Sequence, residues 1–200
     1  MPIDMQHAWL LTAIPLFVFV VVSLFGKRIP RQGDWIVALA GFACFAISIM
    51  FIIDFQSYFQ NSGFEPGNNN KYSFEWINIP NYLLIEYSTF VDAITIVMLF
   101  VVSLVGLMVI LYSIGYMHGE PRYNWYFSLL AFFLAAMFTL VTTGNLLQLY
   151  LAWEGVGLGS YLLIGFYWER QSAAEAAKKA FITTRIGDVG LLIGIIMLWR

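Results

Sequence analysis

The stretch LYLAWEGVGLGSYLLIGFYWER, residues 149–170, decides how this chain folds. Apart from Glu154 and the last two residues, it contains only aliphatic, aromatic, glycine and serine residues. A run of about 20 apolar residues crosses a ~30 Å hydrocarbon layer as a helix, because lipid offers no hydrogen-bond partner to an open backbone. The stretch therefore predicts a membrane-spanning helix that carries one carboxylate near its centre.

The composition of the whole chain indicates the same environment. The 200 residues are 60% hydrophobic and 11% charged, whereas soluble domains contain about 25% charged residues. The net charge of −2 and the absence of a basic patch among aromatics give no support for nucleic-acid binding. The lipid bilayer is the partner that this composition implies.

The sequence offers no ligands for a cofactor or a metal. Cys44 is the single cysteine and lies in an apolar run, so an internal disulfide is excluded and a small buried side chain is the simplest interpretation. No CxxC, no GxGxxG after a strand and no pair of histidines across helices is present. We therefore expect no cofactor, no metal site and no redox chemistry in this chain itself.

Six stretches are apolar enough to span the bilayer, which predicts an all-α integral membrane protein. They are Ala8–Phe25, Trp35–Asp54, Phe90–Tyr112, Trp125–Thr143, Asn145–Trp168 and Ala176–Trp199. The long polar segment between the second and third spans contains YSFEWINI, residues 72–79, whose alternation predicts a short strand. A small hairpin on the membrane surface follows from this pattern, with a simple tether as the alternative.

Glu154 lies about nine residues into its span, or about 13 Å from the start. A carboxylate at this depth costs about 2.5–3.5 kcal/mol, so such residues face a helix bundle or a wet cavity and often mark proton paths. A protonated glutamate that joins helices by hydrogen bonds is the structural alternative. The nearby Gly155 and Gly159 have the spacing that lets helix backbones approach closely.

The sixth span adds further charges within the membrane. Arg185 and Asp188 are three residues apart, so their side chains can pair on one helix face. Lys179 lies nearer the end of the span and can extend its amino group to the membrane surface. Asp34, at the start of the second span, is expected at a hydrated helix end.

Residues 149–170, followed by AAKKAFITTRIGDVGLL at 176–192, resemble helices five and six of subunit L, or chain 5, of NADH-quinone oxidoreductase, respiratory complex I. FVDAITIVMLFVVSLVGLMVILYSIGYMHGEPRYNWYFS, residues 90–128, is similar to the third helix and following loop of that subunit. The resemblance runs from about Trp76 to Arg200. It divides the chain into 1–75, with two spans; 76–126, of the chain-5 N-terminal type; and 127–200, the start of an antiporter-like proton-translocating bundle.

The resemblance implies a proton-translocating subunit without cofactors of its own, whose partners are other membrane-arm subunits of complex I, above all the neighbouring antiporter-like one. Glu154 matches the family's essential glutamate, Arg185 and Asp188 its charged pair, and Lys179 the lysine before AF. The family's cationic partner of the glutamate is a lysine on a following helix, outside this chain. Because family members are about three times as long, we expect a fragment or one piece of a split protein.

Two other functions stay open on the sequence alone. The large subunit of Mrp-type sodium/proton antiporters is similar in this region and would make the chain part of a transporter rather than of an enzyme. A purely structural membrane bundle, with Glu154 as an interhelical contact, is the second alternative.

The distribution of Lys and Arg predicts the orientation in a cell inner (plasma) membrane. The residues on one side are Lys27, Arg28, Arg31, Arg122, Arg170, Lys178 and Lys179, and those on the other are Lys71 and Arg200. Cytoplasmic loops carry the excess of positive charge, so both ends of the chain are expected outside. A cysteine introduced at Asn69 should then react with an impermeant reagent added from outside, and labelling from the cytoplasmic side would contradict this topology.

Overall fold

The computed structural model describes residues 5–62, 71–79 and 83–198, and six of its helices are long and apolar enough to cross a membrane. Their bounds are Trp9–Phe25 (α1), Asp34–Ser62 (α2), Ala93–Tyr116 (α3), Tyr123–Thr142 (α4), Leu146–Ile164 (α5) and Gln171–Leu198 (α6). The prediction of a six-helix integral membrane protein is confirmed. Two helices are longer than expected, since α2 continues past Asp54 and α6 begins before Ala176.

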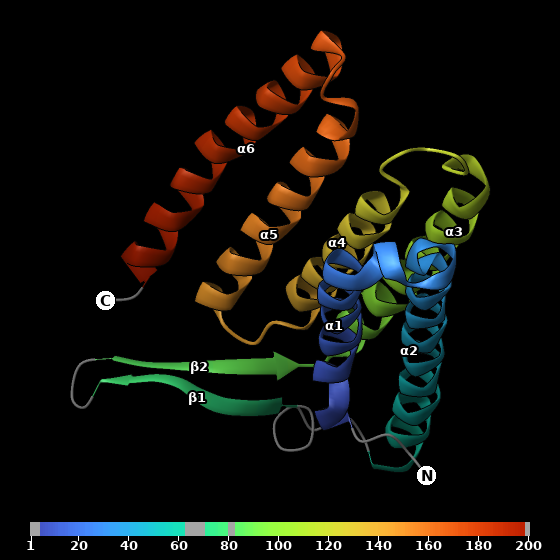
Figure 1. Cartoon of the computed structure of the whole chain (residues 1–200). Coiled ribbons are helices and arrows are strands. Elements are labelled where there is room, and N and C mark those ends of the chain that lie inside the picture. The colour runs from blue at the N-terminus through green and yellow to red at the C-terminus, as the bar shows by residue number, and fades with distance from the viewer. Residues whose placement is uncertain (1–4, 63–70, 80–82, 199–200) are drawn as a thin grey trace.

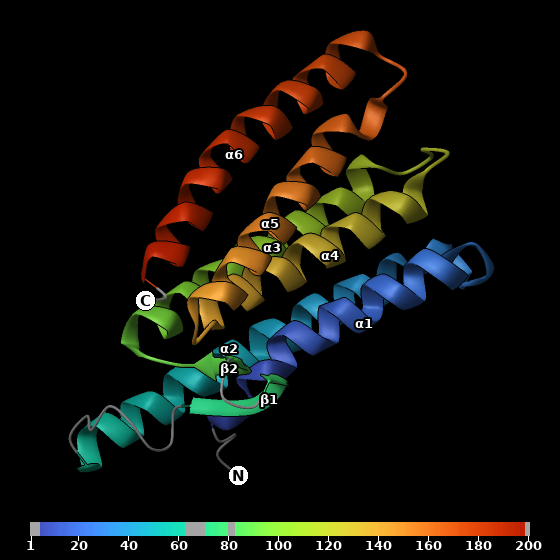
Figure 2. The same ribbon diagram turned by 90° about the vertical axis from the view of Figure 1, so that its left-hand side faces the viewer.

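The helices run alternately up and down, so their connections gather at two ends (Figures 1 and 2). Helices α1 to α4 form a packed bundle, α5 lies along α4, and α6 packs on α5 and the short turn before it. The core lies within the first four helices and includes Leu11, Phe51, Leu99, Phe127 and Phe138, all fully buried. By contrast, α6 has few buried side chains, among them Ala177, Asp188 and Ile195.

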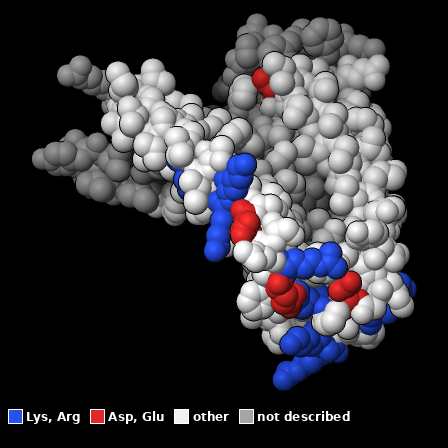
Figure 3. All heavy atoms as spheres, turned by 90° about the horizontal axis from the view of Figure 1, so that it is seen from above, with Lys and Arg blue, Asp and Glu red and all other residues white. Residues whose placement is uncertain are grey.

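The end that holds the α1–α2, α3–α4 and α5–α6 connections carries most of the Lys and Arg residues. Figure 3 looks onto this end and shows Lys and Arg side chains beside Asp and Glu. Among them, Arg122 of the α3–α4 connection pairs with Glu169 of the α5–α6 connection at 2.8 Å. The positive loops of the sequence therefore lie together on one face, as the alternation of helices requires.

A β-hairpin lies across the other end of the bundle (Figure 1). Its strands Lys71–Ile79 (β1) and Leu83–Phe90 (β2) pair antiparallel, with Ser73 opposite Ser88. The backbone N–H of Ser88 donates to Oε1 of Gln148 at 3.0 Å, and Gly144 N–H donates to the Ser88 carbonyl at 2.9 Å. The predicted hairpin is thus present, and it fixes the α4–α5 turn from which α5 begins.

The start of α5 is defined by a side-chain cap. Asn145 has extended backbone angles, and its Oδ1 accepts from the Gln148 N–H at 2.7 Å. Asparagine is a favoured cap because its side chain satisfies one of the free N–H groups of the first turn. Strand β2 of the hairpin contains Tyr87. Burial raises the pKa of the Tyr87 hydroxyl above its usual value, and a hydrogen bond with Thr12 acts in the opposite direction.

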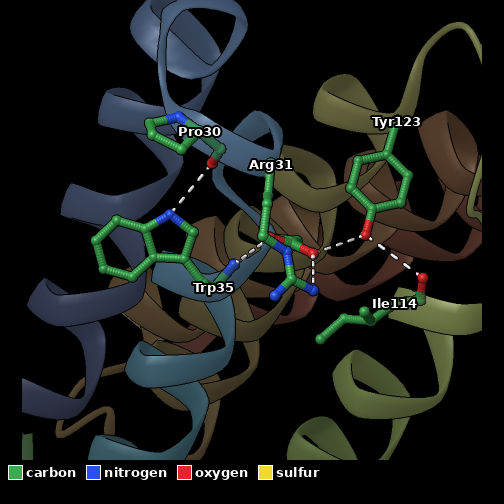
Figure 4. A network of polar contacts seen from close by, with 6 residues as sticks. Pro30, Arg31, Trp35, Ile114 and Tyr123 are labelled. Carbon is green, nitrogen blue, oxygen red and sulfur yellow. Dashed lines mark hydrogen bonds and ion pairs between the residues drawn. The ribbon is translucent and has the colours of Figure 1, made fainter.

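The expectation for Asp34 was wrong, because this residue is buried rather than hydrated. Its residue exposure is 2%, and Tyr123 donates its hydroxyl to Asp34 Oδ2 at 3.0 Å. Arg31 Nη2 lies 3.4 Å from the same oxygen, and the Trp35 N–H donates to Oδ1 at 2.7 Å. Figure 4 shows Tyr123, Arg31 and Trp35 around this carboxylate, which joins the start of α2 to the start of α4.

Removal of the Tyr123 hydroxyl should therefore destabilise the bundle. A hydrogen bond to a charged group contributes about 1.5–3 kcal/mol, so Tyr123→Phe should lower the thermal unfolding midpoint of the protein in lipid nanodiscs. Tyr112→Phe is the matched control, because Tyr112 is 69% exposed on α3. Equal midpoints for the two variants would contradict the role given to this contact.

Candidate functional site

The sequence-predicted charges Glu154, Arg185 and Asp188 meet between α5 and α6. Arg185 Nη1 contacts Glu154 Oε2 across the helix pair, and the same nitrogen lies 3.6 Å from Asp188 Oδ2. The side chains of Arg185 and Glu154 are 30% and 21% exposed, and that of Asp188 is 5% exposed. One guanidinium thus serves two carboxylates near the middle of two apolar helices.

Asp188 has a second partner that the sequence analysis did not identify. The indole Nε1–H of Trp153 donates to Asp188 Oδ1 at 2.9 Å. Asp188 therefore contacts Arg185 through one oxygen and Trp153 through the other. Trp153 and Glu154 are neighbours in the chain, so the four residues form a closed ring that begins and ends on α5.

An aromatic side chain covers the guanidinium on another side. The centre of the Phe181 ring lies 4.5 Å from Arg185 Cζ, and the Tyr161 ring is 5.1 Å from that of Phe181. A cation over an aromatic face is stabilised by about 0.5–2 kcal/mol. The Nε–H of Arg185 is buried and has no hydrogen-bond partner among the described residues. Arg185 is thus held by electrostatic contacts and stacking rather than by a full set of hydrogen bonds.

The small residues of α5 divide the helix into two faces. A methyl group on Gly155 would lie 3.3 Å from Ala136 Cβ, and one on Gly159 would lie 3.0 Å from Phe133 Cδ2. These two positions face α4, as the GxxxG spacing predicted. Gly157 instead faces Arg185, whose Nη2 would be 3.5 Å from a methyl group there. One face of α5 therefore packs closely on α4, and the face that carries Glu154 lies against the charged side chains of α6.

Lys179 does not join this cluster. Its side chain is exposed, and it precedes Arg185 by six residues, or about 9 Å along the helix. Lys178 lines a cavity of about 550 Å³ at the charged end, together with Arg122 and Tyr161. Tyr161 lines this cavity and contacts the Phe181 ring, which in turn contacts the Arg185 guanidinium.

The cluster has the parts of a protonatable site. Two acids share one cation, so an acid from which the guanidinium moves away loses electrostatic compensation in an apolar interior. A proton bound there would restore neutrality. No group of three His, Cys, Asp or Glu side chains suited to a metal occurs among the residues that the structure describes. The chemistry that this arrangement supports is exchange of a proton.

Comparisons with known proteins agree with the helices that hold this cluster. Residues 143–200 match the family model described as NADH:quinone oxidoreductase/Mrp antiporter, TM, and residues 76–127 match NADH-Ubiquinone oxidoreductase (complex I), chain 5 N-terminus. The chain thus resembles the proteins that these two family models describe over residues 76–127 and 143–200. The recognised segments include α3, α5 and α6, and thus the four residues of the ring.

Relatives of this family resemble the chain over nearly its whole length. It is 39% identical over 96% of its length to NAD(P)H-quinone oxidoreductase subunit 5, chloroplastic, of Piper cenocladum, and 36% identical over 96% to NADH-quinone oxidoreductase subunit L of Mycobacterium tuberculosis. It is 39% identical over 96% to F(420)H(2) dehydrogenase subunit L of Methanosarcina mazei. The chain spans 26%, 30% and 27% of these relatives, respectively.

A solved structure has the same fold. A chain of the membrane-bound sulfane sulfur reductase, an archaeal respiratory membrane complex, matches 97% of this chain and 37% of its own length, with a TM-score of 0.73 and 18% identity. At this identity the match concerns the arrangement of helices. It agrees with the six-helix architecture described above.

The packing of α5 on α4 gives a direct test of the two faces. Gly159→Val should destabilise the protein by about 1–3 kcal/mol, because a larger side chain overpacks a close helix contact. Gly194→Val is the control, since nothing lies within 4 Å of a methyl group at that position. The comparison is made by thermal unfolding in nanodiscs, and tolerance of Val at both positions would overturn the assignment of the α4 face.

Proposed function

We propose that this chain is part of a proton-translocating membrane subunit of a quinone oxidoreductase related to respiratory complex I, with Glu154 as the group that binds and releases the proton. The observation that carries the proposal is the contact of Glu154 with Arg185 halfway along α5. A carboxyl group at this depth is costly unless it is paired or used. Glu154 pairs with Arg185, which the second acid Asp188 also contacts. This shared cation supports a role in proton exchange rather than in packing alone.

The mechanism follows from two opposing effects on a carboxyl group. An apolar interior favours the neutral acid, and a nearby cation favours the carboxylate. When Arg185 lies against Glu154, the proton is released, and when Arg185 moves toward Asp188, Glu154 binds a proton again. A conformational change that shifts the guanidinium between the two acids would therefore move a proton on and off Glu154.

The relatives support an assignment to a redox-driven complex. The names of the relatives given above are those of NAD(P)H-quinone, NADH-quinone and F(420)H(2) dehydrogenase subunits, and the match to a chain-5 model covers residues 76–127. In this proposal the electron transfer takes place in other subunits, and the partners of the chain are other membrane-arm subunits, including a neighbouring antiporter-like one. An Mrp-type antiporter remains the second candidate, because the model matched at 143–200 names both groups. Genes for redox subunits beside this one would favour the oxidoreductase.

The orientation is proposed from the charge distribution. The positive residues Lys27, Arg28 and Arg122 belong to the connections at the charged end of the bundle, and Lys178 lies in α6 beside Arg122 at the same end. Because cytoplasmic loops carry the excess of Lys and Arg, this end is proposed to face the cytoplasm. The N-terminus and the hairpin would then lie outside a cell inner (plasma) membrane.

Glu154→Gln tests the function directly. The amide keeps the size and the ability to hydrogen-bond, but it cannot exchange a proton, so proton uptake into vesicles should fall to near background in the assembled complex. Glu154→Asp keeps the carboxyl group and should retain part of the activity. Glu169→Gln is the matched control, because Glu169 is 66% exposed in its side chain and lies at the charged end.

The measurement is proton uptake beside electron-transfer rate, at matched abundance of the complex. If Glu154→Gln pumps as many protons per electron as the wild type, then Glu154 is a structural contact and the proposed function is wrong. Proton uptake that follows a sodium gradient without electron transfer would instead favour the antiporter.

A further inference from the structure

We propose that Trp153 is a positioning residue that sets how Arg185 divides its charge between Asp188 and Glu154. This inference rests on the proposed function of Glu154 and adds a residue to it. It follows from the ring in which Trp153 contacts Asp188, Asp188 contacts Arg185, and Arg185 contacts Glu154. Trp153 acts on the proton site through two other side chains, although it is the chain neighbour of Glu154.

The donors to Asp188 explain this influence. Among the described residues, its carboxylate receives the Trp153 indole N–H on Oδ1 at 2.9 Å and has Arg185 near Oδ2 at 3.6 Å. Asp188 is 4% exposed, so water cannot readily replace either donor. The closer donor is the neutral indole. Its hydrogen bond satisfies one oxygen of the Asp188 carboxylate, so the guanidinium of Arg185 stays against Glu154.

The tryptophan side chain has fewer rotatable bonds than the arginine side chain. Trp153 has a rigid ring on α5, whereas Arg185 has a long side chain whose Nε–H lacks a hydrogen-bond partner in the described part of the structure. If the indole N–H is removed, Arg185 should therefore move toward Asp188. Glu154 would lose its cation and keep its proton.

The size of the effect follows from the bond that is lost. One hydrogen bond to a charged group changes an equilibrium by about tenfold or more. Trp153→Phe should therefore reduce proton pumping by about tenfold or more at matched abundance, the factor that this bond contributes. Trp125→Phe is the control: Trp125 is 43% exposed on α4, close to the 48% of Trp153, and it is outside the ring.

A rescue variant separates the hydrogen bond from the packing of the indole. In Trp153→His, the Nε2–H of a neutral imidazole takes the place of the indole Nε1–H in the five-membered ring. Measured above the usual imidazole pKa of about 6.5, this variant should recover most of the pumping lost in Trp153→Phe. A packing role would instead predict that the smaller His ring is at least as harmful as Phe.

A double-mutant cycle provides the decisive comparison in the complete membrane complex. If Trp153 acts through Asp188, then Trp153→Phe causes no further loss of protons per electron when Asp188→Asn is already present. Additive losses, or wild-type pumping by Trp153→Phe while Glu154→Gln is inactive, would overturn this inference and leave the proposed function intact. Normal pumping by Glu154→Gln would overturn both.

Discussion

One guanidinium between two carboxylates is the interaction around which the α5–α6 pair is organised. Arg185 contacts Glu154 on one helix and Asp188 on its own, and both acids lie in the middle of otherwise apolar segments. Removing one member of a buried charge pair costs about 3–5 kcal/mol, because the partner is left uncompensated. The shared cation reduces that penalty for each acid, and it also makes the charge state of one acid depend on the other.

The rest of the bundle holds this pair at a defined place without enclosing it. At one end the hairpin contacts the first turn of α5 through Ser88 and Gln148, and at the other Asp34 and Tyr123 join α2 to α4. Between these ends the first four helices form the core. In contrast, the outward side of α6 exposes apolar residues such as Ile186 and Met197, which suits contact with lipid or with another helix. The charged cluster thus lies between the packed bundle and a helix that has few buried side chains.

The sequence was sufficient for the spans and the hairpin, because bilayer thickness and alternation impose them. It also placed Glu154, Arg185 and Asp188 within the membrane. It did not pair Glu154 with Arg185, since the relative rotation of α5 and α6 decides that contact and a single helix pattern does not contain it. Trp153 was missed for the same reason, although its position beside Glu154 was visible. Asp34 was misplaced because its partner Tyr123 lies 89 residues away.

Glu154 is proposed to change its protonation state during turnover. Infrared difference spectroscopy of the complete complex, recorded between the resting and the electron-transferring states, measures this directly through the carboxylic acid C=O stretch. The account predicts a C=O band that appears or disappears with electron transfer in the wild type and is absent from the spectrum of Glu154→Gln. Identical difference spectra for the two proteins would contradict it.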